Sequence, residues 1–394
     1  MKQSWELSAI DTLFFRESRP MEAPGSSELL SLFPPSARTL AGAIRSHIGE
    51  SMGVNWQDFR KNKDNPVRQL IGYGDDFAEQ LQFYGVWVHY KGERLYPAPL
   101  NLMVKQDDKQ LRTKITQIDF IYIGIPCECD LGKKVHLPCL PERMVGSKSL
   151  NNHWLTTAGL QKVLSGKTPD RNDDIISRQQ LLKEEHRLGI ARDNQTRRVK
   201  EGMLYQTRHI RLNKNTALSI DVNIAGDNLK AGLIKLGGEG RMASLQAMEQ
   251  SPIFPALPSK GLDTCKGIIL YLLTPLLLPE NSAFLPDFQK NETEQGTVWQ
   301  GKINKISLTL VSSIIGKAQR EGGWDMAKHE PIAVQSLLPA GSVFYCTVDN
   351  HSPQNIQDAM LALHNTNIGK EQHLGRGHLA VGLWHDVATK GANK

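Results

Sequence analysis

A proline-rich stretch near residue 250 constrains the fold most strongly, because it divides the chain of 394 residues into two parts. Three prolines fall within Ser251–Gly261, and a strongly apolar run, Ile268–Leu273, begins soon after. Proline fixes φ and lacks a backbone donor, so this stretch is expected to be an extended connector outside any sheet. We therefore predict one domain over 1–250, a linker over 251–262 and a second domain over 263–394.

The carboxy-terminal half shows an ordered series of strand and helix patterns. Strands are predicted at 267–273, 306–310, 341–346 and 379–384, and a helix is predicted to begin at Pro353 with Ser352 as its N-cap. In that helix Ile356, Met360 and Leu363 follow an i, i+4, i+7 spacing and should be buried. This order matches a βαββαβ ferredoxin-like unit whose first helix is weak or replaced.

The amino-terminal half begins in a similar way. Apolar and polar residues alternate from Trp5 to Ala9, and a helix should follow Phe33-Pro34-Pro35, with Ser36 as its N-cap and Gly49 just beyond its end. A strand at 83–90 then turns through Lys91-Gly92 into a second strand, which is a hairpin pattern.

Residues 100–215 follow a looser pattern, and we interpret them as an insertion into the first unit. A second hairpin is expected to form around the turn Asn213–Asn215, because Leu218, Ile220 and Val222 alternate with polar residues directly after it. The sequence thus predicts an α+β fold made of two ferredoxin-like domains, the first carrying a long insertion.

A short glycine-rich pattern, Gly-x-Gly-basic-apolar-Ala, occurs once in each half. Backbone without Cβ atoms and an adjacent cation are suited to a phosphate, while the alternative is a pair of tight turns before strands. Neither copy fits the dinucleotide-binding fingerprint. The candidate phosphate contacts are Gly237, Gly238, Gly240 and Arg241 in the first copy and Gly375, Arg376, Gly377 and His378 in the second.

Two further basic segments are candidate RNA contacts. In the helix after Pro35, Arg38, Gly42 and Arg45 share one face, and seven residues separate the two arginines by about 10 Å along the axis. The segment 186–200 is rich in positive charge, including Arg192, Arg197 and Arg198, and is predicted to be a mobile arm that orders on a polyanion, with Tyr205 nearby to stack on a base. Solvated surface arginines and a solvated loop are the respective alternatives.

The net charge of +6 and the pI near 8.9 favour an anionic partner, and no basic amphipathic helix points to a membrane. The most apolar run, Ile268–Leu278, is too short to span a bilayer, and the first residues turn polar where a secretory signal would not. Five cysteines are an odd number and suggest reduced thiols. We therefore expect a cytoplasmic protein.

No catalytic signature is convincing, and we predict neither a catalytic residue, nor a bound metal, nor a cofactor. Ser165–Thr168 resembles the end of a phosphate-binding loop, but Gln161 stands where its first glycine belongs. Three cysteines and His136 within Cys127–Cys139 are compatible with zinc, although unligated thiols are the alternative that we prefer. His47 is a possible general base, or it simply complements the helix dipole.

Several of these segments resemble one known family. The matching motifs are Asp11–Arg16, Leu32–Arg45, Leu236–Arg241, Leu338–Val343, Gly189-Ile190, Asp193, Thr196 and Gly202–Tyr205. Together they resemble the third RAMP subunit of the type III-B CRISPR (Cmr) effector module. They are spread over nearly the whole chain, and the block from Phe33 to Arg45 is the most specific.

The resemblance implies two ferredoxin-like, RRM-related RAMP domains in an antiviral ribonucleoprotein. It implies that the glycine-rich loops and insertions help hold the 5′ handle of the CRISPR RNA, beside the large polymerase-like subunit and the backbone RAMP subunit, without nuclease activity. The base-stacking signature of ordinary RRM domains is absent. An alternative within the same superfamily is a metal-independent endoribonuclease that processes repeat RNA with His47 as base.

Overall fold

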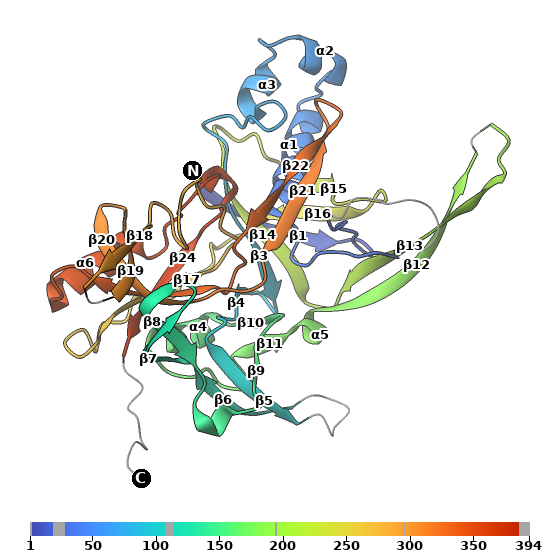
Figure 1. Ribbon diagram of the computed structural model, residues 1–394. Helices are drawn as coiled ribbons and strands as arrows, with labels where there is room; N and C mark the ends of the chain where they lie inside the picture. Colours follow the sequence, from blue (N-terminus) through green and yellow to red (C-terminus); the bar gives the residue numbers. More distant parts are fainter. Residues whose placement is uncertain (1, 19–27, 108–113, 194, 295, 386–394) are drawn as a thin grey trace.

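The computed structural model describes residues 2–18, 28–107, 114–193, 195–294 and 296–385. The described chain contains far more β-strand than helix, and its strands form two large antiparallel sheets and several small ones (Figure 1). The fold is therefore of the α+β type and rich in sheet. None of the described helices is both long enough and apolar enough to cross a bilayer.

The first large sheet belongs mainly to the amino-terminal half and has the order β11-β10-β4-β3-β14-β1-β16-β15. Its strands are β1 (Lys2–Ala9), β3 (Gln82–Tyr90), β4 (Glu93–Pro97), β10 (His153–Leu155), β11 (Ile175–Ser177), β14 (Thr216–Asn223), β15 (Gly232–Lys235) and β16 (Met242–Ala247). The predicted hairpin through Lys91-Gly92 is confirmed as β3 and β4. The predicted hairpin at Asn213–Asn215 is wrong, because β14 pairs with the distant strands β1 and β3.

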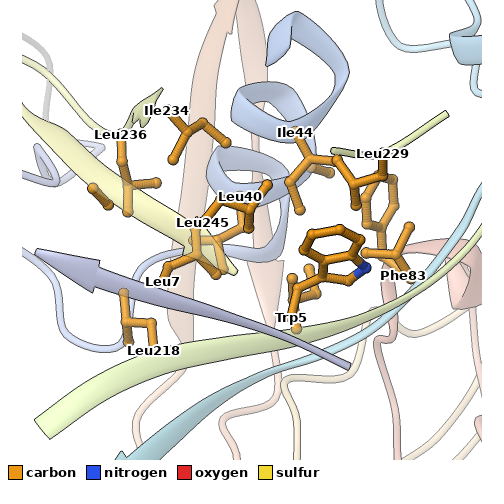
Figure 2. Close-up of a cluster of buried hydrophobic side chains, with 14 of the residues drawn as sticks. Trp5, Leu7, Leu40, Ile44, Phe83, Leu218, Leu229, Ile234, Leu236 and Leu245 are labelled. Carbon is orange, nitrogen blue, oxygen red and sulfur yellow. The ribbon is translucent and has the colours of Figure 1, made fainter. Parts of the chain in front are cut away.

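Helix α1 (Ala37–Ser51) covers this sheet and supplies much of its core. Leu40, Ile44 and Ile48 are fully buried and belong to one cluster with sheet residues such as Trp5 and Leu7. Figure 2 shows Leu40 and Ile44 in this cluster. Burial of each such side chain contributes about 1.5–3 kcal/mol, so this apolar face fixes the helix on the sheet.

The predicted start of α1 is confirmed and its predicted end is wrong. The Thr39 amide donates to Ser36 Oγ at 3.2 Å, as an N-cap requires. The helix continues past Gly49 to Ser51, however. A Cβ at Gly49 would lie 2.7 Å from the Trp56 ring, so this glycine permits close packing and does not end the helix.

The second large sheet lies in the carboxy-terminal half and has the order β18-β19-β20-β23-β17-β24. Its strands are β17 (Gly267–Leu272), β18 (Gln289–Thr293), β19 (Gly296–Ile303), β20 (Ile306–Ile314), β23 (Val343–Val348) and β24 (Leu379–Trp384). Helix α6 (Pro353–Leu363) begins at the predicted cap, where Ser352 Oγ accepts from the Asn355 amide at 3.2 Å. The predicted strands and this helix are confirmed. In the described chain the hairpin β18–β19 stands between β17 and β20, where a first helix would be.

The segment 100–215 builds several small units. Strands β5 (Leu102–Asp107), β6 (Lys114–Phe120) and β9 (Lys148–Ser149) form one sheet, and β7 (Tyr122–Cys129) and β8 (Gly132–Cys139) form another. A long hairpin of β12 (Leu182–Arg192) and β13 (Val199–Leu212), which also pairs with β2 (Glu28–Leu29), projects away from the body (Figure 1). Short helices are α2 (Trp56–Lys61), α3 (Pro66–Ile71), η1 (Glu142–Met144), α4 (Thr157–Leu164), α5 (Arg178–Leu181) and η2 (Gln372–Leu374).

The two halves are packed together by a shared apolar core. Trp87 and Tyr96 of the first sheet lie in one buried cluster with Tyr271 and Tyr345 of the second. The hairpin of β21 (Gln319–Asp325) and β22 (Glu330–Leu337) extends from the carboxy-terminal half alongside α1 (Figure 1). Residues 251–259 between the halves contain neither helix nor strand, as the prolines predict.

Candidate nucleic-acid interface

The first glycine-rich loop, Gly237–Gly240, is an exposed turn just before β16. Gly237 has φ +83°, and a Cβ there would lie 2.4 Å from the Phe14 carbonyl oxygen. The Gly238 amide donates to that same oxygen at 2.8 Å, which fixes the loop on the Asp11–Arg16 segment. Gly240 has φ +65° and open space around it, so its amide and that of Glu239 are the candidates for an anion.

Arg241 follows this loop and lies at the base of the projecting hairpin. Its Nη1 donates to Asp11 Oδ2 at 3.1 Å, and about a fifth of the side chain stays exposed. The loop and this guanidinium therefore share one surface. The predicted juxtaposition of glycine backbone and arginine is present in this copy of the pattern.

The basic segment 186–200 forms an ordered hairpin and not the mobile arm that we predicted. Strands β12 and β13 pair from Leu182–Leu212 out to Ile190–Leu204. At the tip, Asp193 Oδ1 accepts from the amides of Gln195 and Thr196, which holds the turn. Cross-strand backbone hydrogen bonds supply the order that charge composition alone did not suggest.

Two of the three predicted arginines of this hairpin are exposed at its tip. Arg197 and Arg198 lie at the tip and are exposed. The Arg192 side chain lies outside the described residues. The Tyr205 ring covers Gly189 on the opposite strand, since a Cβ at Gly189 would lie 2.3 Å from it. The hairpin therefore carries exposed arginines at its tip and an aromatic ring, Tyr205, closer to the body of the protein.

The second glycine-rich loop, Gly375–His378, is internal, in contrast to the first. A Cβ at Gly375 would lie 2.1 Å from the Gly85 amide nitrogen, and one at Gly377 would lie 2.0 Å from the Ile368 carbonyl oxygen. His378 is buried, and its Nε2 lies 2.8 Å from Asn365 Oδ1. These glycines allow close approach of protein backbone, so the expected phosphate contact at this loop is not available in this conformation.

Arg376 and Arg38 belong to an ion cluster between the halves, which corrects the expectation that they face RNA. Arg376 is 2% exposed, and its Nη2 donates to Glu321 Oε1 at 2.7 Å. Arg38 Nη1 contacts Asp75 at 2.6 Å, and its Nη2 contacts Glu371. Burial raises the pKa of Glu321 in spite of these cations. The cluster holds β21 and the second glycine loop against α1.

Arg45 also serves the packing of α1, whereas the space around Gly42 is open. Arg45 Nη1 donates to the Gly74 carbonyl oxygen at 2.7 Å, its guanidinium lies 4.4 Å from the centre of the Phe77 ring, and burial lowers its pKa to about 10. A Cβ at Gly42 would meet no atom within 4 Å. The predicted face with two arginines exists, but both guanidinium groups contact protein.

The block Phe33-Pro34-Pro35 lines a cavity of about 240 Å³ between the halves. Trp154 and Arg376 contribute to the same wall, and the Phe33 and Trp154 rings pack edge to face at 5.8 Å. This block thus positions the start of α1 against the carboxy-terminal half.

The residues considered for catalysis and zinc have other partners. His47 is 8% exposed, and its Nε2 lies 2.9 Å from the Lys230 carbonyl oxygen. Because a carbonyl oxygen can only accept, this nitrogen carries the proton and donates. His136 Nδ1 likewise contacts the Gly124 carbonyl oxygen at 2.9 Å. All five cysteines are free thiols, and within the described residues no three His, Cys, Asp or Glu side chains gather so that they could hold a metal.

Sequence reasoning missed the carboxylate that joins the loop to the hairpin. Asp11 contacts Arg241 and also Arg211 of β13, at 2.8 Å. Arg211 was not a candidate, although Glu185 and Arg187 on β12 and His209 and Arg211 on β13 alternate as residues sharing one hairpin face would. That alternation is the signal that could have identified the cluster.

The family model of the CRISPR-associated protein Cas_Cmr3 matches residues 5–384, almost the full length of the chain. The chain belongs to the Cas_Cmr3 family. The predicted resemblance to the third RAMP subunit of the Cmr module is thereby confirmed.

The sequence identity to individual relatives is between 12% and 32% in three examples. The Cmr3 subunit of the CRISPR CMR system of Saccharolobus solfataricus is 32% identical over 132 residues, which are 33% of this chain and 38% of that protein. A chain in the cryo-EM structure of the type III-B Cmr-beta complex with cognate target RNA and AMPPnP is 17% identical, with a TM-score of 0.47 over 87% of this chain and 86% of that one. A chain of the Csm3–Csm4 subcomplex of the type III-A interference complex is 12% identical, with a TM-score of 0.34 over 87% of this chain and 92% of that one.

Proposed function

We propose that this Cmr3-family protein is a non-catalytic RNA-binding subunit that helps hold the 5′ handle of the CRISPR RNA. The observation that carries the proposal is the exposed Gly237–Gly240 turn, which lies beside Arg241 at the base of a hairpin with Arg197 and Arg198 at its tip. Backbone amides and guanidinium groups are the donors that phosphate oxygens accept from most readily. Such contacts fix the position of a strand without reading its bases.

We also propose that each half is a ferredoxin-like domain of the RRM-related RAMP kind, over 1–250 and 263–394. In the first sheet the central order β3-β14-β1-β16 corresponds to ferredoxin-like strands 2-3-1-4, and in the second β20-β23-β17-β24 does the same. Each half carries one helix of the pair, α1 in the first and α6 in the second. Each glycine loop then precedes the fourth strand of its domain.

The proposed partners are the large polymerase-like subunit and the backbone RAMP subunit of the effector. Family membership supports a place within such an assembly. Exposed apolar side chains at Trp324, Met326 and Val334 of the β21–β22 hairpin and at Ile125 of β7 are available for protein contacts.

Binding of a labelled single-stranded handle RNA to the full chain tests the function. If about four phosphates are contacted, log affinity should fall with log salt with a slope of about −3. A slope near zero would contradict the proposal.

A charge placed on the turn tests its location. Gly240→Asp is tolerated by the backbone, since Asp adopts positive φ more readily than most residues, and should weaken binding about fivefold to tenfold. Gly240→Asn is the neutral match. Gly53→Asp adds the same charge at another open turn with φ +67°, and should change affinity less than twofold. Equal losses in both Asp variants would place the RNA elsewhere.

The alternative, a metal-independent endoribonuclease that uses His47, is tested by incubating repeat RNA with the chain in chelator. Because His47 Nε2 donates to a backbone carbonyl and is buried, we expect the RNA to stay intact. Specific cleavage that disappears in His47→Ala would favour the enzyme.

A further inference from the structure

We propose that Arg187, Arg211 and Arg241 form a phosphodiester-binding site for single-stranded RNA, with Asp11 as the residue that positions them. We call these four residues the Asp11 arginine cluster. The inference rests on the proposed function. It assigns to the RNA surface Arg211, which the sequence did not single out, and gives Arg187, within the basic segment 186–200, a specific place there. It also gives Asp11, part of the Asp11–Arg16 motif, a specific role.

Three separate elements bring the guanidinium groups to one carboxylate. Arg211 Nη2 of β13 donates to Asp11 Oδ1 at 2.8 Å. Arg241 Nη1, after the glycine loop, and Arg187 Nη2 of β12 approach Asp11 Oδ2 at 3.1 Å and 3.5 Å. Asp11 lies two residues beyond the end of β1, so the cluster marks the point where the sheet, the hairpin and the loop meet.

Like charges brought this close repel each other, so the arrangement needs a compensating anion. Asp11 supplies it for all three arginines, and Glu185 adds a second carboxylate beside Arg187 and Arg211. The backbone hydrogen bond from Thr12 and, after it, the arginine neighbours lower the pKa of Asp11, which keeps it ionised. The three arginines exceed the two carboxylates by one positive charge, which leaves the cluster cationic.

The histidine beneath the cluster contributes no charge at neutral pH. His209 is buried and stacks on Phe14 at 5.1 Å, and its Nδ1 lies 3.1 Å from Thr12 Oγ1. Burial, together with Arg241 and Arg187, lowers its pKa to about 4. The site is thus a rigid apolar and aromatic floor with guanidinium groups above it.

Donors remain on the arginines for a further anion. Both carboxylates contact Arg187 through the same nitrogen, Nη2, whereas a guanidinium carries five N–H donors. The side chains of Arg187 and Arg211 are 35% and 43% exposed, so solvent reaches them. Several forked donors on one surface match the oxygens of a phosphodiester, and a single strand can pass from this cluster to the Gly240 turn or along the hairpin to Arg197.

The test is salt-dependent binding of labelled single-stranded RNA to full-length Arg187→Gln and Arg211→Gln variants. Each should lose about fivefold in affinity and reduce the magnitude of the salt slope by about 0.7, equally for two unrelated RNA sequences. The matched control is Arg143→Gln, since Arg143 is 59% exposed, is also paired with a carboxylate, Asp119, and lies on η1 away from the cluster. It should lose less than twofold.

Arg211→Lys is the control for misfolding of the hairpin, because it keeps the positive charge and the aliphatic part of the side chain and removes only the forked guanidinium donors. We expect a loss of about twofold to threefold with an unchanged salt slope. If Arg187→Gln and Arg211→Gln behave like Arg143→Gln while the wild type binds RNA, this site is wrong and the proposed function stands. If the wild type shows no salt-dependent binding, both fail. Stronger competition by polyglutamate than by RNA would assign the cluster to a protein partner and overturn the proposal.

Discussion

Replacing Arg376 with Met should cost the protein about 3–5 kcal/mol of unfolding free energy. Arg376 is 2% exposed and Glu321, its partner at 2.7 Å, is 4% exposed. Removal of one member of a buried ion pair leaves the other charge without water and without its partner, which is the reason for a cost of about this size. Arg38, whose Nε lies 3.9 Å from Glu321 Oε1, compensates only in part.

The cost should depend on pH in a defined direction. Burial already raises the pKa of Glu321 above its ordinary value of 4.5, and loss of Arg376 raises it further. A carboxyl group whose folded-state pKa is raised destabilises the folded state above that pKa, and the penalty disappears as pH falls toward the unfolded value. The difference between Arg376→Met and wild type should therefore shrink as the pH is lowered from 7 toward about 4.5.

Urea denaturation followed by circular dichroism measures both effects. Two variants accompany it. Glu321→Gln combined with Arg376→Met removes both charges and should recover part of the loss. Arg143→Met removes an arginine whose side chain is 59% exposed and should cost less than about 1 kcal/mol. A loss below about 1 kcal/mol for Arg376→Met, or one that grows on acidification, would refute the reasoning.

Three other predictions concern single positions. Gly42→Ala should stabilise the protein by about 0.5–1 kcal/mol in urea denaturation and leave RNA affinity unchanged, because Gly42 lies inside α1 and a Cβ meets no atom within 4 Å. Gly375→Ala should lower the free energy of unfolding by more than about 2 kcal/mol, because its Cβ would collide with the Gly85 backbone. Gly240→Ala, with a similar φ and open space around it, should cost about 1 kcal/mol. Equal costs for the two variants would contradict the packing described for Gly375. Burial lowers the pKa of His378 to about 3, so the stability of the folded state should fall as the pH drops below 6.5. The His378→Gln variant should lose less stability over that range. An identical pH profile for the variant and the wild type would exclude His378 as the cause.

Local sequence patterns were sufficient to predict an element where its own residues decide its structure. Strand β24 occupies the predicted residues 379–384, and α6 begins at the predicted cap, because runs of apolar residues and a Ser-Pro start need no distant partner to be recognised. The helix end predicted from Gly49 and the hairpin predicted at Asn213–Asn215 were wrong for the opposite reason. The glycine is required by the Trp56 ring of α2, and the turn leads into a strand that pairs with β1 and β3, so both depend on contacts with other elements.

The two glycine-rich patterns show the same division at the candidate site. Both contain glycines with positive φ and an arginine, and both precede a strand. Arg241 remains at the surface beside Asp11, whereas Arg376 is enclosed by Glu321 and Glu371. No property of the six-residue pattern distinguishes them. The difference comes from what packs on the second copy: its glycines approach the backbone of Gly85 and Ile368, and Glu321 of the β21–β22 hairpin pairs with Arg376.

The family, four strands of the carboxy-terminal half (β17, β20, β23 and β24) and the positions of the basic residues follow from the sequence, because motif identity and apolar periodicity are local properties of the chain. The hairpins β18–β19 and β21–β22 were not predicted. Which arginines contact solvent and which contact carboxylates was decided by tertiary structure alone. A guanidinium takes its partner from whatever the packed sheets and hairpins bring within about 3–4 Å, and these neighbours lie up to hundreds of residues away in the chain.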